Sequence, residues 1–283
     1  LNKEESLELV NKLESYKINS YLHFAAEESK TEEGMDISLA NTLETLSFSK
    51  ESSSLPFTVF KATALGPMSL FKKKGDKIDF TNSEEETWKR VLNRIDTCCE
   101  NAKKMGVNLL IDAEESWFQD AIDEIAESLM EKYNKETPFV YTTLQMYRKD
   151  RLEYLKNLHK NATKKGFKIG VKLVRGAYIE KENSRALQLG ISSPICESKL
   201  MTDLNFNAGL DFILKNLEDC SLFLGSHNEQ SVKRVIDWMV ENKIEKDHPH
   251  VWFSQLLGMA DHISFNLASE GYSVVKYLPY GPV

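Results

Sequence analysis

The stretch from Phe167 to Tyr178, Phe-Lys-Ile-Gly-Val-Lys-Leu-Val-Arg-Gly-Ala-Tyr, decides the fold class of this chain. It begins as a short apolar run, Ile169 to Val174, in which Lys172 is the single cation. Arg175 ends the run, and charged stretches with helical character lie on both sides. This pattern predicts a buried parallel strand whose carboxyl end delivers two cations and a phenol into a loop. The alternative is a core strand with snorkelling charges. Matching polar residues at the ends of other strands would exclude this alternative.

The same alternation of strand and helix continues along the chain. We predict strands at 21–26, 57–63, 107–113, 138–143, 169–174, 220–226, 251–256 and 272–277. Helices are expected at 2–16, 84–105, 116–133, 150–165, 200–217 and 230–242, with Gly106 and Gly166 closing two of them. Eight alternating strands imply a parallel sheet. The first strand is followed by no dinucleotide-binding glycine pattern, so a closed α/β barrel of the (β/α)8 TIM-like type is favoured over an open doubly wound sheet.

Two segments and the C-terminal end depart from a regular barrel. Residues 27–54 are acidic and rich in Ser and Thr, and residues 66–83 contain three consecutive lysines. We expect both to be surface excursions, the first with a little helix around 39–46. Nothing remains after strand eight to form the eighth helix, which predicts a bare apolar flank on strands eight and one. We therefore expect residues 1–283 to form a single distorted barrel domain, incomplete at its C-terminus, in a protein that extends past Val283.

The composition excludes several classes of function. A formal net charge of −7 argues against a general nucleic-acid-binding protein, because neutralising phosphates requires a basic surface. The four cysteines show no metal-binding spacing and indicate a reduced interior. No apolar run approaches the roughly 20 residues that cross a bilayer. The chain starts with Leu1, so we expect any targeting segment to have been removed.

Polar side chains gather where the predicted strands end, which is where active sites form in a barrel of this kind. They are Lys61, Asp112, Gln145, Arg175 with Tyr178, His227 with Asn228, Gln255, and Tyr277. Singly, each has a structural explanation: Lys61 and Asp112 could form an ion pair, His227 could lie on the surface, and Tyr277 could serve packing alone. Together, cations and phenols without a nucleophile–base pair indicate binding of an anionic small molecule beside a cofactor.

A metal site is not expected. His248 and His250 precede a strand, which puts them at the wrong end of the barrel, and His23 stands alone on the first strand. A hydrolase that uses two metal ions would need more His and Asp side chains at the rim.

Seven stretches carry a resemblance to a known family. They are Lys-Leu-Val-Arg-Gly-Ala-Tyr (172–178), Phe-Lys-Ala-Thr-Ala-Leu (60–65), Ile-Asp-Ala-Glu-Glu (111–115), Ser-His-Asn (226–228), Gln-Leu-Leu-Gly-Met-Ala-Asp (255–261), Lys-Tyr-Leu-Pro-Tyr-Gly-Pro (276–282) and Ser-Ser-Pro-Ile-Cys-Glu-Ser-Lys (192–199). The chain resembles proline dehydrogenase (proline oxidase), and the last of these stretches resembles the eukaryotic branch. The motifs follow the family's order over nearly the whole chain. The family folds as a distorted (β/α)8 barrel with FAD at its centre, which agrees with the pattern of strands and helices.

The resemblance implies a role for each candidate residue. Lys61 would bind the proline carboxylate, and Asp112 would belong to the polar network at that end of the site. Tyr178, Leu256 and Tyr277 would wall the proline ring against the flavin. The FAD-binding residues would be Gln145, Lys172, Arg175, Gly176, Ala177, Lys199, His227 and Asn228. The implied reaction moves a hydride from the carbon beside the proline nitrogen to flavin N5 and yields pyrroline-5-carboxylate.

Further expectations also follow from the resemblance alone. The family places two adjacent arginines on its last helix, where they clamp the substrate carboxylate, and no such pair follows strand eight here. The choice between proline and hydroxyproline therefore stays open, and the alternatives are a hydroxyproline dehydrogenase of the same family or an inactive, cofactor-free truncated barrel. A quinone electron acceptor, the matrix side of the mitochondrial inner membrane and a peripheral contact with that membrane are implied.

Overall fold

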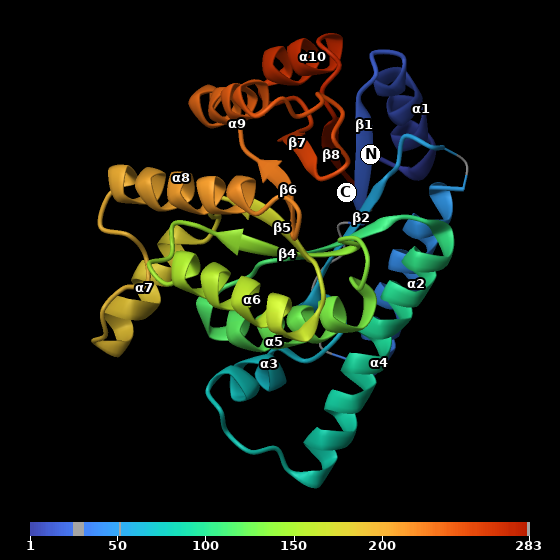
Figure 1. The fold of residues 1–283 in the computed structure, drawn as a ribbon. Helices are drawn as coiled ribbons and strands as arrows, with labels where there is room; N and C mark the ends of the chain where they lie inside the picture. The colour runs from blue at the N-terminus through green and yellow to red at the C-terminus, as the bar shows by residue number, and fades with distance from the viewer. Residues whose placement is uncertain (25–30, 51, 282–283) are drawn as a thin grey trace.

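Eight parallel strands close into a barrel in the computed structural model, which describes residues 1–24, 31–50 and 52–281 (Figure 1). The strands follow one another around the barrel in chain order, and β8 pairs with β1 to close it. Their bounds are β1 Asn19–Phe24, β2 Phe57–Lys61, β3 Asn108–Asp112, β4 Val140–Gln145, β5 Ile169–Val174, β6 Cys220–Gly225, β7 Val251–Leu256 and β8 Val274–Tyr280. The predicted (β/α)8 fold is confirmed.

Helices surround the barrel, as the predicted alternation requires (Figure 1). Their bounds are α1 Lys3–Glu14, α2 Glu32–Phe48, α3 Met68–Gly75, α4 Asn82–Met105, α5 Ser116–Tyr133, α6 Arg151–Lys165, α7 Ile179–Leu189, α8 Lys199–Lys215, α9 Glu229–Glu241 and α10 Asp261–Ser269, with a 3-10 turn at Ala62–Ala64. Gly106 and Gly166 end α4 and α6 in the left-handed conformation, as predicted, with φ of 70° and 68°. Within the described residues, no helix combines the length and apolar character needed to cross a membrane.

Large side chains fill the interior of the barrel. One buried cluster contains Tyr21, Phe57, Val59, Leu110, Tyr141, Phe223 and Val275. Its rings meet edge to face, and the centroid of Phe57 lies 5.0 Å from Phe223 and 5.6 Å from Tyr141. A second, larger cluster packs the outer faces of the strands against the helices. Because the interior is filled, a ligand must bind at the end of the barrel, where the strand termini and loops leave space.

The surface excursion predicted at 27–54, with a little helix around 39–46, contains a longer helix in its described part. Residues Glu32–Phe48 form α2, which packs against β1 and α4. The buried Ser38 and Thr45 of α2 donate their hydroxyls to backbone carbonyls four residues earlier, at 3.0 and 2.8 Å. This local bonding satisfies the hydroxyls, so a helix rich in Ser and Thr can still be buried. Residues 27–30 and 51 of the predicted excursion lie outside the described residues.

The loop predicted for 66–83 is also partly wrong, because it contains the helix α3. The side chain of Phe71 in α3 is fully buried, and its ring meets Trp88 of α4 edge to face at 5.1 Å. The three lysines that suggested a loop, Lys72, Lys73 and Lys74, occupy the last turn of this helix. Cations are stabilised there by the helix dipole, so a lysine run is compatible with a helix end.

The flank of β8 and β1, which was predicted to be bare, is covered. Helix α1 packs against both strands and buries Val10 and Leu13 (Figure 1). The carbonyl of Leu1 accepts a hydrogen bond of 3.0 Å from the amide of Gly281, just past β8. No helix follows β8 in the part of the chain that the structure describes. The prediction of a bare flank failed because it did not consider the helix before β1.

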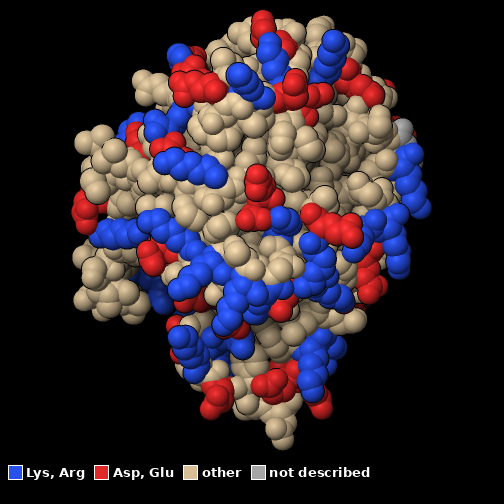
Figure 2. Space-filling model, viewed as in Figure 1, with Lys and Arg blue, Asp and Glu red and all other residues tan. Residues whose placement is uncertain are grey.

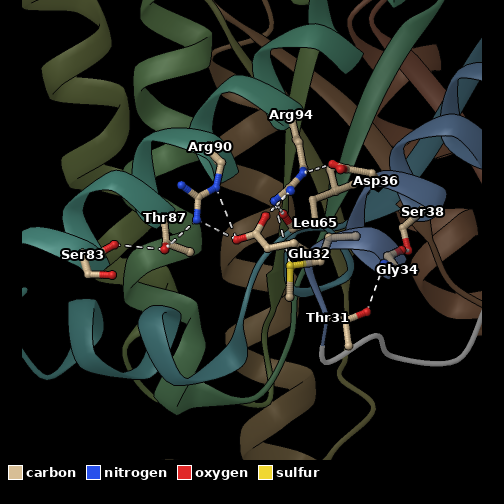
Figure 3. Close-up of polar contacts among 11 residues, drawn as sticks. Thr31, Glu32, Gly34, Asp36, Ser38, Leu65, Ser83, Thr87, Arg90 and Arg94 are labelled. Carbon is tan, nitrogen blue, oxygen red and sulfur yellow. Dashed lines mark hydrogen bonds and ion pairs between the residues drawn. The ribbon is translucent and has the colours of Figure 1, made fainter.

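Surface charges of both signs are interspersed on the face shown in Figure 2. Many belong to exposed pairs such as Lys132 with Asp96, which contribute little to stability. Arg94 of α4 differs because its side chain is only 6% exposed. Its guanidinium donates to Asp36 Oδ1 at 2.8 Å, to the carbonyl of Leu65 at 3.3 Å, and to Glu32 (Figure 3). Arg94 thereby ties α2 and the segment after β2 to α4.

We predict that Arg94→Met lowers the free energy of unfolding by about 1–3 kcal/mol, because the buried Leu65 carbonyl loses its charged donor. Arg90 is the matched control, since it also binds Glu32 but its side chain is 50% exposed. Arg90→Met should cost less than about 1 kcal/mol. Denaturant-induced unfolding of both variants measures the difference, and equal losses would contradict the proposed importance of the buried contact.

Candidate active site

All thirteen side chains or backbone positions predicted for the site line one cavity of about 640 Å³. They come from the carboxyl ends of the seven strands β2 to β8 and from the start of α8, where the barrel closure brings them together. They are Lys61, Asp112, Gln145, Lys172, Arg175, Gly176, Ala177, Tyr178, Lys199, His227, Asn228, Leu256 and Tyr277. For the stretch from Phe167 to Tyr178, the alternative of a core strand with unrelated snorkelling charges is therefore excluded.

The ion pair of Asp112 is made with Lys172 and not with Lys61, which corrects the alternative considered from the sequence. Lys172 Nζ lies 2.5 Å from Asp112 Oδ1, and both side chains are largely buried. Burial by itself would lower the pKa of Lys172, but Asp112 and Tyr21 outweigh it and raise that pKa above its ordinary value. Lys172 therefore stays charged, and the pair fixes a positive and a negative group inside the mouth of the barrel.

Lys61 is left available by this pairing. It ends β2 directly beside Asp112 in the strand register. Among residues 1–24, 31–50 and 52–281, no side chain or carbonyl forms a hydrogen bond or ion pair with its ammonium group. An ammonium with three donors and no partner at the wall of a cavity suits an anionic ligand group.

The loop that follows β5 is held by Tyr147 and Gln145. Gly176 has a φ of +138°, and a Cβ at this position would lie 2.2 Å from the ring of Tyr147, so only glycine fits. The amide of Tyr147 donates to the carbonyl of Arg175 at 2.7 Å. Gln145 accepts from the amide of Ala177 at 3.0 Å and donates to the carbonyl of Glu114 at 2.9 Å. Gln145 thus connects the loop after β5 to the loop after β3 through hydrogen bonds to both backbones.

Two cations share one carboxylate at the rim of the cavity. Arg175 Nε and Lys199 Nζ both donate to Asp203, each at 2.8 Å. The hydrogen bond from Lys199 and then the one from Arg175 keep the pKa of Asp203 below its ordinary value. The three groups carry one net positive charge. Arg175 is further fixed by Ser226 and Ser231, whose hydroxyls accept at 3.2 Å.

His227 and Asn228 each use one end of the side chain within the protein. His227 Nε2 accepts from the amide of Leu256 at 3.1 Å. Burial and then Lys276 lower the pKa of His227, so the ring is neutral and its Nδ1 carries the proton. Asn228 Oδ1 caps α9 by accepting from the amide of Ser231 at 2.9 Å. Both residues therefore keep an N–H donor that is not used in these contacts.

The sequence alone did not single out Tyr21, His23 or Glu114. Tyr21 lines the cavity, and His23, which was predicted to stand alone, has its Nδ1 2.6 Å from Tyr277 Oη. The sequence signal that could have found Tyr21 and His23 is their spacing of two along β1, which puts both side chains on one face of the strand. Glu114 is buried, and both the amide and the hydroxyl of Thr63 donate to its carboxyl group. Within the described residues, no group of three or more His, Cys, Asp or Glu is placed to hold a metal ion.

Glu114 gives a prediction about pH. Burial raises its pKa to about 7, against the effect of the Thr63 hydrogen bonds and the Lys61 cation. A carboxyl group with a higher pKa in the folded state favours folding most below its unfolded pKa, and this advantage is lost as the pH rises through about 7.

We therefore predict that wild type loses up to about 3 kcal/mol of unfolding free energy relative to Glu114→Gln between pH 4.5 and 8. Glutamine imitates the protonated carboxyl group and does not titrate. Denaturant unfolding across this range measures the difference, with the exposed Glu124→Gln as control. Parallel pH curves for wild type and Glu114→Gln would show that the pKa of Glu114 is not raised.

Comparison with known proteins adds independent information. The sequence model of the family described as proline dehydrogenase matches residues 6–283. The protein named carbapenem antibiotics biosynthesis protein CarD, from Pectobacterium carotovorum subsp. carotovorum, is 32% identical over 262 residues, which cover 93% of this chain and 67% of CarD. The human protein named proline dehydrogenase 1, mitochondrial, is 38% identical over 207 residues, which cover 72% of this chain and 34% of the human protein.

A solved structure has the same fold. Proline utilization A (PutA) from Bdellovibrio bacteriovorus, inactivated by N-propargylglycine, matches with a TM-score of 0.87 at 22% identity. The match covers 100% of this chain and 30% of that one, so this chain spans about a third of the length of PutA and of the human relative. Since the family model covers almost every residue, and two relatives exceed 30% identity over most of the chain, this chain belongs to the proline dehydrogenase family.

Proposed function

We propose that this chain oxidises L-proline to pyrroline-5-carboxylate, with bound FAD as the hydride acceptor. The observation that carries the proposal is the distribution of charge in the cavity. On the β2 side, Lys61 offers an ammonium group without a partner among the described residues. On the β5 and β6 side, Arg175 and Lys199 leave one net positive charge beside the donors of His227 and Asn228. An amino-acid carboxylate suits the first side, and a large anionic cofactor suits the second.

The residues on the β5 and β6 side are chemically suited to a flavin nucleotide. A net positive charge, a neutral imidazole N–H and an amide N–H₂ match the phosphate and carbonyl oxygens of FAD, all of which accept hydrogen bonds. The volume of about 640 Å³ lies in the range of small-molecule sites. FAD, when bound, supplies the hydride acceptor. Gln145, Lys172, Arg175, Gly176, Ala177, Lys199, His227 and Asn228 would hold it.

The remaining residues would bind and orient the substrate. Lys61 binds the carboxylate, and the Asp112–Lys172 pair stabilises the polar end of the cavity. Tyr178, Leu256 and Tyr277 line the cavity and limit the positions that a five-membered ring can take. Fixed orientation next to the cofactor lowers the barrier to transfer, because the entropy of alignment is lost on binding. The cations Lys172 and Arg175 favour negative charge that develops on the cofactor side.

The acceptor and compartment belong to the same proposal. The human relative carries the word mitochondrial in its name. For this chain we propose the matrix side of the mitochondrial inner membrane, a quinone as the final electron acceptor, and a peripheral contact with the membrane surface.

Anaerobic mixing of the purified, FAD-reconstituted protein with L-proline tests the function. The absorption of oxidised flavin near 450 nm should be lost with proline and more slowly with hydroxyproline. A faster reaction with hydroxyproline would support the related dehydrogenase instead. Failure to retain FAD after reconstitution would support the cofactor-free alternative.

We predict that Lys61→Met raises KM for proline by about ten- to a hundredfold while FAD content stays the same, because a charge-assisted contact to a carboxylate is lost. Arg175→Met is the complementary variant and should lower FAD content more than Lys61→Met does. Flavin absorbance per protein and steady-state kinetics separate the two effects. An unchanged KM in Lys61→Met would reduce this lysine to a structural charge.

A further inference from the structure

Tyr277 and His23 form a hydrogen-bonded pair at the wall of the cavity. They come from the adjacent strands β8 and β1, where Tyr277 lies beside Tyr21 in the register and His23 follows two residues later. Tyr277 Oη is 2.6 Å from His23 Nδ1, and the two rings are 5.9 Å apart and tilted by 39°. The ring of Tyr21 meets Tyr277 edge to face at 5.2 Å. The phenol is therefore held on one side by an aromatic ring and at its hydroxyl by an imidazole.

The direction of this hydrogen bond follows from the acidity of the two groups. A phenol O–H is a stronger acid than the N–H of neutral imidazole, and an imidazole nitrogen is a stronger base than a phenol oxygen. Tyr277 therefore donates and His23 Nδ1 accepts. Burial lowers the pKa of His23, Lys61 and Lys172 act in the same direction, and Asp112 opposes them, so the neutral acceptor is the favoured state. Burial, followed by Asp112, Tyr21 and Tyr178, raises the pKa of Tyr277, so the phenol keeps its proton.

We propose that His23 is a positioning residue that makes the Tyr277 hydroxyl an acceptor toward the cavity. A phenol has one hydrogen to donate. When His23 engages that hydrogen, any further partner of the oxygen must itself be a donor. This wall of the cavity then selects a ligand with an N–H group near Tyr277. The inference rests on the proposed function in one respect, namely that the donor is the secondary ammonium of proline.

The bond direction can be tested without any cofactor or substrate. In ¹⁵N-histidine-labelled protein, the signal that is lost in His23→Phe belongs to His23. We expect that signal to show the tautomer with an unprotonated Nδ1. Tyr277→Phe should raise the pKa of His23, because a neutral acceptor loses its donor.

The same spectrum contains two reference histidines. His250 Nδ1 lies 3.3 Å from the carbonyl of Leu217, which can only accept, and His227 Nε2 accepts from the amide of Leu256. Both should show a protonated Nδ1, opposite to His23. A protonated Nδ1 at neutral His23, or a fall of its pKa in Tyr277→Phe, would overturn the proposal.

A double-mutant cycle tests the effect on the ligand. His23→Phe should lower kcat/KM for proline about three- to tenfold in the wild-type background, as expected for one misdirected hydrogen bond. In the Tyr277→Phe background the same change should have almost no further effect, since there is no hydroxyl to orient. His250→Phe, at the other end of the barrel, serves as the control for a general effect of losing a histidine. Equal losses from His23→Phe in both backgrounds would reduce His23 to a structural role.

Tetrahydrofuran-2-carboxylate, the ring-oxygen isostere of proline, separates the donor from the rest of the ligand. It keeps the carboxylate and the ring but lacks the N–H group. His23→Phe should therefore change the inhibition constant of tetrahydrofuran-2-carboxylate less than twofold, while it lowers kcat/KM for proline. A similar loss for both ligands would contradict an acceptor role of Tyr277. If wild type does not turn over proline, the proposed function fails, whereas the histidine spectra still decide whether His23 orients Tyr277.

Discussion

The pairing of β8 with β1 is the constraint on which the rest of the structure depends. The two strands pair from Asn19 with Val275 to Phe24 with Tyr280, the longest register around the barrel. Closure turns the carboxyl ends of eight strands into one ring, so residues separated by more than 200 positions in the chain line one cavity. It also brings His23 within hydrogen-bond distance of Tyr277. An open sheet would leave these two residues on opposite edges.

The closing seam is supported from outside by two helices. Helix α1 packs against β1 and β8, and Tyr280 at the end of β8 forms a hydrogen bond with Thr45 of α2. Arg94 in turn fixes the start of α2 to α4. The N-terminal third of the chain therefore stabilises the strand that carries Tyr277. This explains how a barrel whose described residues include no helix after β8 still covers that seam.

The barrel and the gathering of polar residues at the ends of its strands could be predicted from the sequence, because both depend on local patterns. Gly176, Ala177, Lys199 and Leu256 were expected at the site from the family resemblance alone. Apolar runs between amphipathic helices give parallel strands, and polar residues at the strand ends must meet when the strands close. Two kinds of feature could not be predicted. Helix α2 was expected only as a little helix around 39–46 and α3 was missed, because Ser and Thr hydroxyls bonded to the backbone and a terminal lysine run imitate loop composition. The partner of Asp112 was missed because Lys61 and Lys172 are equally plausible until the side-chain directions are known.

The hydrogen-bond partners divide the cavity residues into those that shape the site and those that remain for a ligand. Both ends of the Gln145 amide are engaged by backbone groups, and Lys172 is engaged by Asp112, so these residues chiefly fix loop position and local charge. Lys61 has no such partner in the described chain. A buried or half-buried polar group without a partner is unfavourable unless a ligand or water satisfies it. The absence of a hydrogen bond or ion pair at Lys61 within the described residues is therefore the feature that supports the proposed binding of a ligand carboxylate there.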